Sequence, residues 1–165
     1  MTPMGPLDRL QAMLAAEGED PILRSIDGRP IALGWATVEL ERAAVELGSD
    51  LGVPTDRFLV ATATSALGAH CVVGSDVLPN GISLVLLEPA TEGRLAASLA
   101  RFGEGPVAIW LAVTDLRTAV ATLAAVNVDV TTERDGPFGA ERLLLDRPTR
   151  GPHRLLVQPA GTIRA

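Results

Sequence analysis

The sequence predicts an α+β fold of two β-α-β-β-β modules with an additional N-terminal helix. One reason is that the same order of apolar runs occurs twice, and each copy has a segment with helical periodicity among strand-like runs. The other is that both copies end in similar hairpins, GAHCVVGSDVLPNGISLVLLEP and GAERLLLDRPTRGPHRLLVQP. We interpret the repeat as one domain over residues 1–165, with the modules at 30–90 and 106–165.

The segment before the first module, residues 1–29, contains the predicted N-terminal helix. In PLDRLQAMLAAEGEDP, Leu7, Leu10, Met13 and Leu14 recur at helical spacing, and the pattern stops at Gly18–Pro21. The first module then reads as strand, helix and three strands: RPIALGWATVEL, ELERAAVELGSDLGV, RFLVATATS, GAHCVV and ISLVLLEP.

A linker at residues 91–105 separates the modules, and the stretch ATEGRLAASLARFGEG, residues 90–105, predicts a helix that ends in glycines. The second module repeats the order of the first, with one strand, one helix and three strands: PVAIWLAV, DLRTAVATLAAVNV, VDVTTER, AERLLLD and HRLLVQP.

Composition excludes several classes of partner. A chain of 165 residues with 47% hydrophobic residues can bury a core, and a net charge of −6 lacks the basic face that nucleic acid requires. No apolar run approaches the roughly 18 residues of a membrane span, so we expect no membrane partner. With Cys71 as the only cysteine and no signal-peptide pattern after Met1, we expect a cytoplasmic protein. All 14 basic residues are arginine, which is typical of a high-GC bacterial genome.

Two motifs, GWATVELERAAVEL and LLEPATEGRLAASLARFGEGPVAIWLAVTDL, resemble the vicinal-oxygen-chelate superfamily. This superfamily includes glyoxalases, extradiol dioxygenases, bleomycin-resistance proteins and methylmalonyl-CoA epimerases, and the epimerase branch is the most similar. The resemblance covers about residues 30 to 160. It implies a cup-shaped mixed sheet made by the two modules, a small-molecule ligand inside the cup, and a homodimer. The apolar stripe of the N-terminal helix, which needs cover, also favours a homodimer.

The resemblance places the family's four metal ligands at Ala32, Val85, Ala108 and Leu155. None of these side chains has an oxygen, nitrogen or thiolate donor, so we expect no metal and no other cofactor. The epimerases also carry a carboxylate base before the third strand, where this sequence has only hydroxyl side chains in LVATATSALG.

The hairpins offer acids in place of the metal. A two-residue turn at Asn80-Gly81 would place Asp76 opposite Val85, and a turn at Arg150-Gly151 would place Asp146 opposite Leu155.

The same register predicts which other side chains line the cup, because side chains alternate between the two faces of a strand. It places His70, Ser83 and Arg142 on the inner face, and Trp110 shares a face with Ala108 and Ala32. The alternatives are structural: the two aspartates can cap turns, His70 and Trp110 can belong to the core, and Arg142 can pair with a surface acid. We expect His153 to face solvent.

The sequence therefore favours a metal-independent isomerase, lyase or cyclase that acts on a small carbonyl-containing molecule, such as an acyl-thioester or polyketide-like acid. We expect the proton-transferring residues to be Asp76, Asp146 and His70. The expected substrate-binding residues are Arg142, Trp110, Ser83, Val85, Ala108, Leu155 and Ala32. The alternatives are a protein that sequesters a small molecule in the cup, and a metal enzyme whose ligands lie elsewhere.

Overall fold

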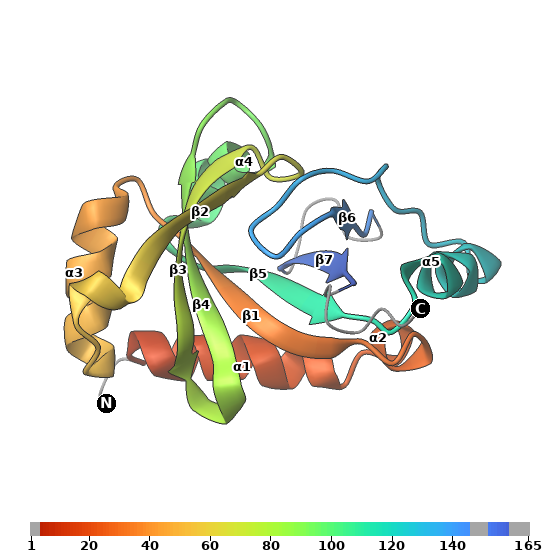
Figure 1. The fold of residues 1–165 in the computed structure, drawn as a ribbon, viewed down its shortest axis with the longest axis horizontal. Helices are drawn as coiled ribbons and strands as arrows, with labels where there is room; N and C mark the ends of the chain where they lie inside the picture. Colours follow the sequence, from red (N-terminus) through yellow and green to blue (C-terminus); the bar gives the residue numbers. More distant parts are fainter. Residues whose placement is uncertain (1–3, 146–151, 159–165) are drawn as a thin grey trace.

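The computed structural model describes residues 4–145 and 152–158, in which seven strands form one mixed sheet (Figure 1). The strand order is β2-β3-β4-β1-β5-β7-β6, so β2 and β6 are the edges. The strands are β1 (Arg29–Ala36), β2 (Phe58–Thr64), β3 (Ala69–Leu78), β4 (Ile82–Pro89), β5 (Gly105–Ala112), β6 (Glu141–Leu143) and β7 (His153–Val157).

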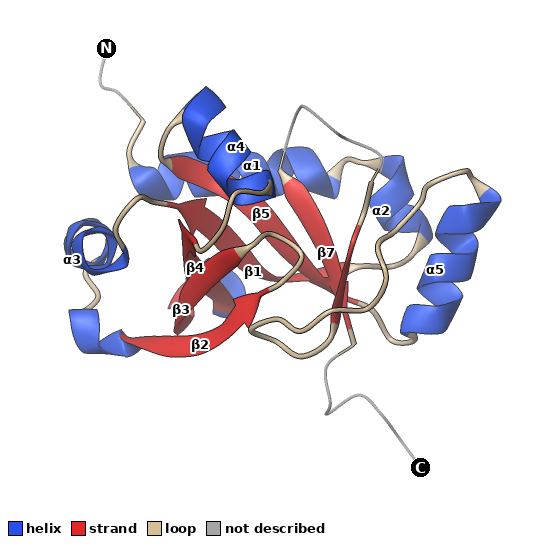
Figure 2. Cartoon of the chain, turned by 90° about the horizontal axis from the view of Figure 1, so that it is seen from above, coloured by secondary structure: helices blue, strands red, loops and turns tan. Residues whose placement is uncertain are grey.

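Five α-helices accompany the sheet in these residues, and Figure 2 shows α3 and α5 at opposite ends of it. They are α1 (Pro6–Gly18), α2 (Pro21–Ser25), α3 (Leu40–Leu51), α4 (Arg94–Phe102) and α5 (Leu116–Ala125). The helices expected before the sheet, in each module and in the linker are thus confirmed. The short α2 was not predicted; it begins at Pro21, where the sequence pattern indicated only the end of α1.

The internal repeat is visible in the strand pairing. β1 runs parallel to β4 and β5 runs parallel to β7, while β1 and β5 pair antiparallel and join the two modules. The prediction of a further strand over residues 128–134 is wrong, because this segment makes only isolated bridges, at Val130 and Arg134. The α+β fold with a curled, cup-shaped mixed sheet is confirmed.

The two faces of the sheet have separate apolar cores. The outer face packs against α1, α3 and α5, with Leu10 of α1 and Leu123 of α5 fully buried. The inner face forms a second cluster, to which α4 contributes Leu95 and Leu99. Since the apolar stripe of α1 is covered by the protein's own sheet, that stripe no longer favours a homodimer.

A buried ion cluster fixes the N-terminal segment to the last strand. Arg154 of β7 is 1% exposed, and its Nη1 lies 2.8 Å from Oδ2 of Asp20. The Nε of the same side chain lies 3.8 Å from Oε2 of Glu17, at the end of α1. The part of the chain before β1 is therefore bound to the sheet by charge as well as by apolar contact.

No helix in the described ranges is both long enough and apolar enough to span a bilayer.

Candidate active site

The inside of the cup is a packed apolar surface. Ala32, Val85, Ala108 and Leu155, where the resemblance is expected to place the family's metal ligands, are each 0% exposed and belong to one cluster. A divalent ion needs donor atoms that these side chains lack, so the family's metal does not fit these positions. Within the described ranges, no group of three or more His, Cys, Asp or Glu side chains could hold a metal elsewhere. The metal content of the protein remains a prediction.

Trp110 lies on the inner face, as the alternation along β5 predicts, and it is 0% exposed. Its ring fits there because position 34 is glycine: a Cβ at Gly34 would lie 2.9 Å from the Trp110 ring and 3.0 Å from Cβ of Ala108. Phe138 packs edge-on against the indole, with ring centroids 5.8 Å apart.

Glu141 is the buried acid of the cup. It opens β6, is 0% exposed, and accepts hydrogen bonds from Oγ1 of Thr64 at 2.5 Å and Nε1 of Trp110 at 3.0 Å. A carboxyl group that accepts a hydrogen bond at each oxygen in an apolar interior is held in one orientation.

Burial sets the protonation of this interior. It raises the pKa of Glu141 above the ordinary 4.5, although the hydrogen bonds from Thr64, Trp110 and Ala66 oppose the shift. Burial also raises the pKa of the Cys71 thiol to about 12, and the nearby Glu141 contributes to that rise. Cys71 is therefore an unreactive thiol, whereas Glu141 is an acid whose proton is held more tightly than in water.

The Glu141–Thr64 hydrogen bond joins the two edges of the sheet. Thr64 ends the edge strand β2 and Glu141 begins the opposite edge strand β6, and next to them the Ser65 N–H donates to the Asp135 carbonyl at 3.1 Å. The loop 135–139 covers the carboxyl group, since a Cβ at Gly136 would lie 1.9 Å from Oε1 of Glu141. The curled sheet is thus closed on this side by the acid itself.

The predicted register of the first hairpin is wrong by three residues. Val73, and not Asp76, lies opposite Val85. The turn has three residues, Pro79–Gly81, and β3 carries two extra residues around Asp76, whose φ is +56°. Asp76 is exposed in this bulge, where its N–H donates to Oγ of Ser83 at 3.3 Å.

The shift by an odd number of residues moves His70 to the other side of the sheet. His70 is exposed and lies opposite Glu88, while its neighbour Cys71 faces the cup. Ser83 shares the inner face of β4 with Val85, as predicted, and is 9% exposed. Proton transfer by Asp76 and His70 was inferred from the predicted register, and the observed register does not support it.

The second hairpin shows the same three-residue shift, with Leu143 opposite Leu155. Arg142 therefore lies on the outer face, opposite Leu156 of the outer core, and not in the cup. Asp146 lies outside the described residues. The expectation for His153 was also wrong: it is half-buried, and its Nε2 lies 3.1 Å from Oγ of Ser98.

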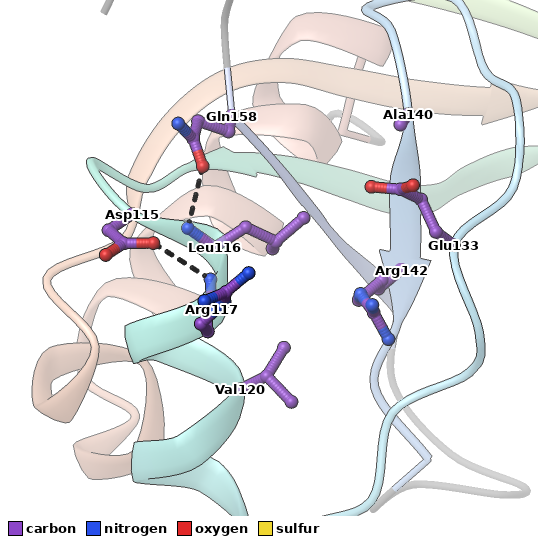
Figure 3. A pocket seen from close by; sticks show the side chains of 8 residues that line it. All are labelled: Asp115, Leu116, Arg117, Val120, Glu133, Ala140, Arg142 and Gln158. Atoms are coloured by element: carbon purple, nitrogen blue, oxygen red, sulfur yellow. Dashed lines mark hydrogen bonds between the residues drawn. The ribbon is translucent and has the colours of Figure 1, made fainter. Parts of the chain in front are cut away.

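Arg142 instead lines a pocket of about 700 Å³ on the outer face, between the start of α5 and β6 (Figure 3). Acidic, basic and apolar side chains all line this pocket. Its lining residues are Asp115, Leu116, Arg117, Val120, Glu133, Ala140, Arg142 and Gln158.

Sequence reasoning missed Glu141, although a signal was present. AERLLLD places one acid at the start of an apolar strand, and an acid there is unusual unless hydrogen-bonded. The predicted register assigned the inner face to Arg142, which necessarily turned Glu141 outward. The correct parity reverses both assignments.

Searches by sequence found no matching family model and no matching curated protein. The fold, however, is similar to that of solved methylmalonyl-CoA epimerases. The enzyme from Mycobacterium tuberculosis has 20% identity and a TM-score of 0.67 over 82% of this chain and 89% of its own. An epimerase in complex with methylmalonyl-CoA and NH4+ has 23% identity and a TM-score of 0.66 over 82% and 96%.

A third similar structure is a Streptomyces coelicolor epimerase variant in complex with 2-nitronate-propionyl-CoA, with 24% identity and a TM-score of 0.64 over 80% and 97% of the two chains. Similarity at this level of identity establishes architecture and leaves activity open. The repeated modules, the order of the strands and these structures agree. The chain has the vicinal-oxygen-chelate fold.

Proposed function

We propose that the protein is a metal-independent isomerase that moves a proton on a small carbonyl-containing molecule, with Glu141 as the group that takes and returns the proton. The observation that carries the proposal is the Glu141 carboxyl group, buried on the inner face of the cup and held by Thr64 and Trp110. A general base is most effective when its pKa lies near the working pH, and burial moves Glu141 in that direction.

The chemistry needs only this carboxylate. Its oxygen accepts the proton from the carbon next to the substrate carbonyl, and the electron pair of the broken C–H bond moves onto the carbonyl oxygen to give an enolate. The planar enolate then turns in the site, and return of the proton to the opposite face of the same carbon completes the isomerisation. The Trp110 indole N–H remains hydrogen-bonded to the carboxyl group and keeps it in this orientation.

Substrate entry requires the loop 135–139 to move away from Glu141. This loop contacts the carboxyl group at Gly136 and packs Phe138 against Trp110. It contains Gly139 at a φ of +104°, a conformation that non-glycine residues rarely adopt. The apolar lining inside favours a substrate whose body is apolar. Acyl-thioesters are the first class to test, because two of the similar epimerases are complexes with acyl-CoA molecules.

The test is deuterium exchange in D2O, followed by NMR at the carbon next to the carbonyl of methylmalonyl-CoA and of short acyl-thioesters. We expect Glu141→Gln to lower the exchange rate on the order of a hundredfold or more, while ligand affinity is retained. Glu41→Gln, at an exposed carboxylate of α3, is the matched control and should exchange at the wild-type rate.

Two results would overturn the proposal in different ways. Full exchange by the Glu141→Gln protein would remove Glu141 from the reaction. Saturable binding in the cup without any exchange by the wild-type protein would instead indicate a protein that sequesters its ligand.

A further inference from the structure

We propose that the outer pocket between α5 and β6 binds a small anion, a carboxylate or a phosphate monoester, between Arg117 and Arg142. Its volume of about 700 Å³ lies within the roughly 300–1,000 Å³ of small-molecule sites. Figure 3 shows the two arginine side chains on opposite sides of the pocket, Arg117 on α5 and Arg142 on β6.

The Arg142 guanidinium is fixed in place and still has donors to offer. Its Nη1 donates to the Thr131 carbonyl at 3.2 Å, and its Nε is buried without a hydrogen-bond partner among the described residues, so the donors that it can offer to the pocket are the remaining Nη protons. Neither arginine forms an ion pair with a carboxylate in the described structure, although Asp115 and Glu133 line the same pocket. Two unpaired guanidinium groups facing one space favour a carboxylate or a phosphate, which accept paired hydrogen bonds.

Recognition would come from these side chains and not from the start of the helix. The Leu116 N–H already donates to Oε1 of Gln158 at 2.9 Å, and the Arg117 N–H donates to Oδ1 of Asp115 at 3.1 Å. The Glu133 carboxylate also lines the pocket, so the bound anion should carry no more negative charge than the two arginines can neutralise. Val120 and Ala140 also line the pocket and give it apolar surface that suits a short apolar body.

The pocket and the cup share strand β6. Glu141 faces the cup and the next residue, Arg142, faces the pocket, so an anion bound to Arg142 would hold the strand that positions Glu141. The anion site stands on its own, however, because its residues are separate from the proton-transfer group. If experiment rejects the anion site, proton transfer by Glu141 is unaffected, and the reverse also holds.

Titration calorimetry with inorganic phosphate and with succinate, together with amide NMR shifts, tests the site on the whole protein. We expect at least one anion to bind with a dissociation constant below about 10 mM, with shifts confined to α5, β6 and the segment at residues 131–133. Phosphate binding alone would identify a phosphate ester as the ligand class, and succinate binding alone would identify a carboxylate.

Arg117→Met and Arg142→Met should each weaken binding about tenfold or more. Arg117 has no hydrogen bond from its side chain in the described structure, so its variant keeps the test valid if Arg142→Met unfolds. Glu133→Gln should strengthen binding about twofold or more, because it removes a repulsive charge. Arg101→Met, on the exposed face of α4, is the control. Absence of binding by both anions, or equal losses in the Arg101 and Arg117 variants, would overturn the proposal.

Discussion

Replacing Glu141 by leucine should destabilise the protein by about 2–6 kcal/mol at neutral pH. The change leaves Nε1 of Trp110 and Oγ1 of Thr64 buried without their acceptor, and each such loss costs roughly 1–3 kcal/mol. Because the Glu141–Thr64 hydrogen bond also joins the two edge strands, the loss should loosen the closure of the sheet and not only one side chain.

Glu141→Gln separates hydrogen bonding from charge. The amide keeps an acceptor for Trp110 and offers an N–H to the Thr64 hydroxyl, so this variant should be much less destabilised than Glu141→Leu. It should also change the pH dependence of stability. A carboxyl group whose folded pKa is raised contributes stability that is fully present below its unfolded pKa, near 4.5, and is lost as the pH rises through the folded pKa. The wild-type protein should therefore lose stability relative to Glu141→Gln over that window.

Urea unfolding followed by tryptophan fluorescence between pH 4 and pH 8 measures both effects. Trp110 reports directly, since its indole is the hydrogen-bond donor to the replaced side chain. An unfolding free energy of Glu141→Leu equal to that of the wild type, or a constant difference between wild type and Glu141→Gln at all pH values, would refute this description of the site.

Further predictions concern other parts of the molecule. Arg154→Met should cost about 3–5 kcal/mol in urea unfolding, because Glu17 and Asp20 lose the buried cation that they share, and an unchanged midpoint would contradict this. Gly136→Ala should lower the unfolding free energy by about 1–3 kcal/mol, because the new methyl group collides with Glu141. A variant as stable as the wild type would show that the loop 135–139 can shift away from Glu141 at no cost in free energy. Elemental analysis of the purified protein should find no stoichiometric divalent metal, and one equivalent removable by chelator would reverse that expectation. Sedimentation should show the homodimer that the family resemblance implies, and a monomer at micromolar concentration would contradict it.

The architecture could be predicted from the sequence because it depends on long, redundant patterns. The order of apolar runs, the duplicated hairpins and the helical periodicity of residues 7–14 each survive an error of a few residues. The strand predicted over residues 128–134 does not form. Most of its side chains are polar, so pairing at a sheet edge would bury little apolar surface. Only its bridges to Leu144 and Glu141 formed.

The site could not be predicted in the same way, because it depends on the parity of single residues. The sequence contains the favoured turn pair Asn80-Gly81, but the chain includes Pro79 in the turn and adds a bulge at Asp76. These local choices shift the register by three residues and exchange the two faces of the strand. Trp110 was placed correctly because β5 is a central strand whose alternation does not depend on a turn.

The proposed chemistry depends most directly on the protonation of Glu141, and 13C NMR titration of glutamate-labelled protein measures it. The Glu141 carboxyl resonance can be assigned as the one missing from the Glu141→Gln spectrum. We predict a titration midpoint above the ordinary value of 4.5, because the carboxyl group is buried. A midpoint at or below 4.5 would show that the hydrogen bonds from Thr64, Trp110 and Ala66 outweigh burial, and Glu141 would then be a fixed structural carboxylate and not a proton carrier.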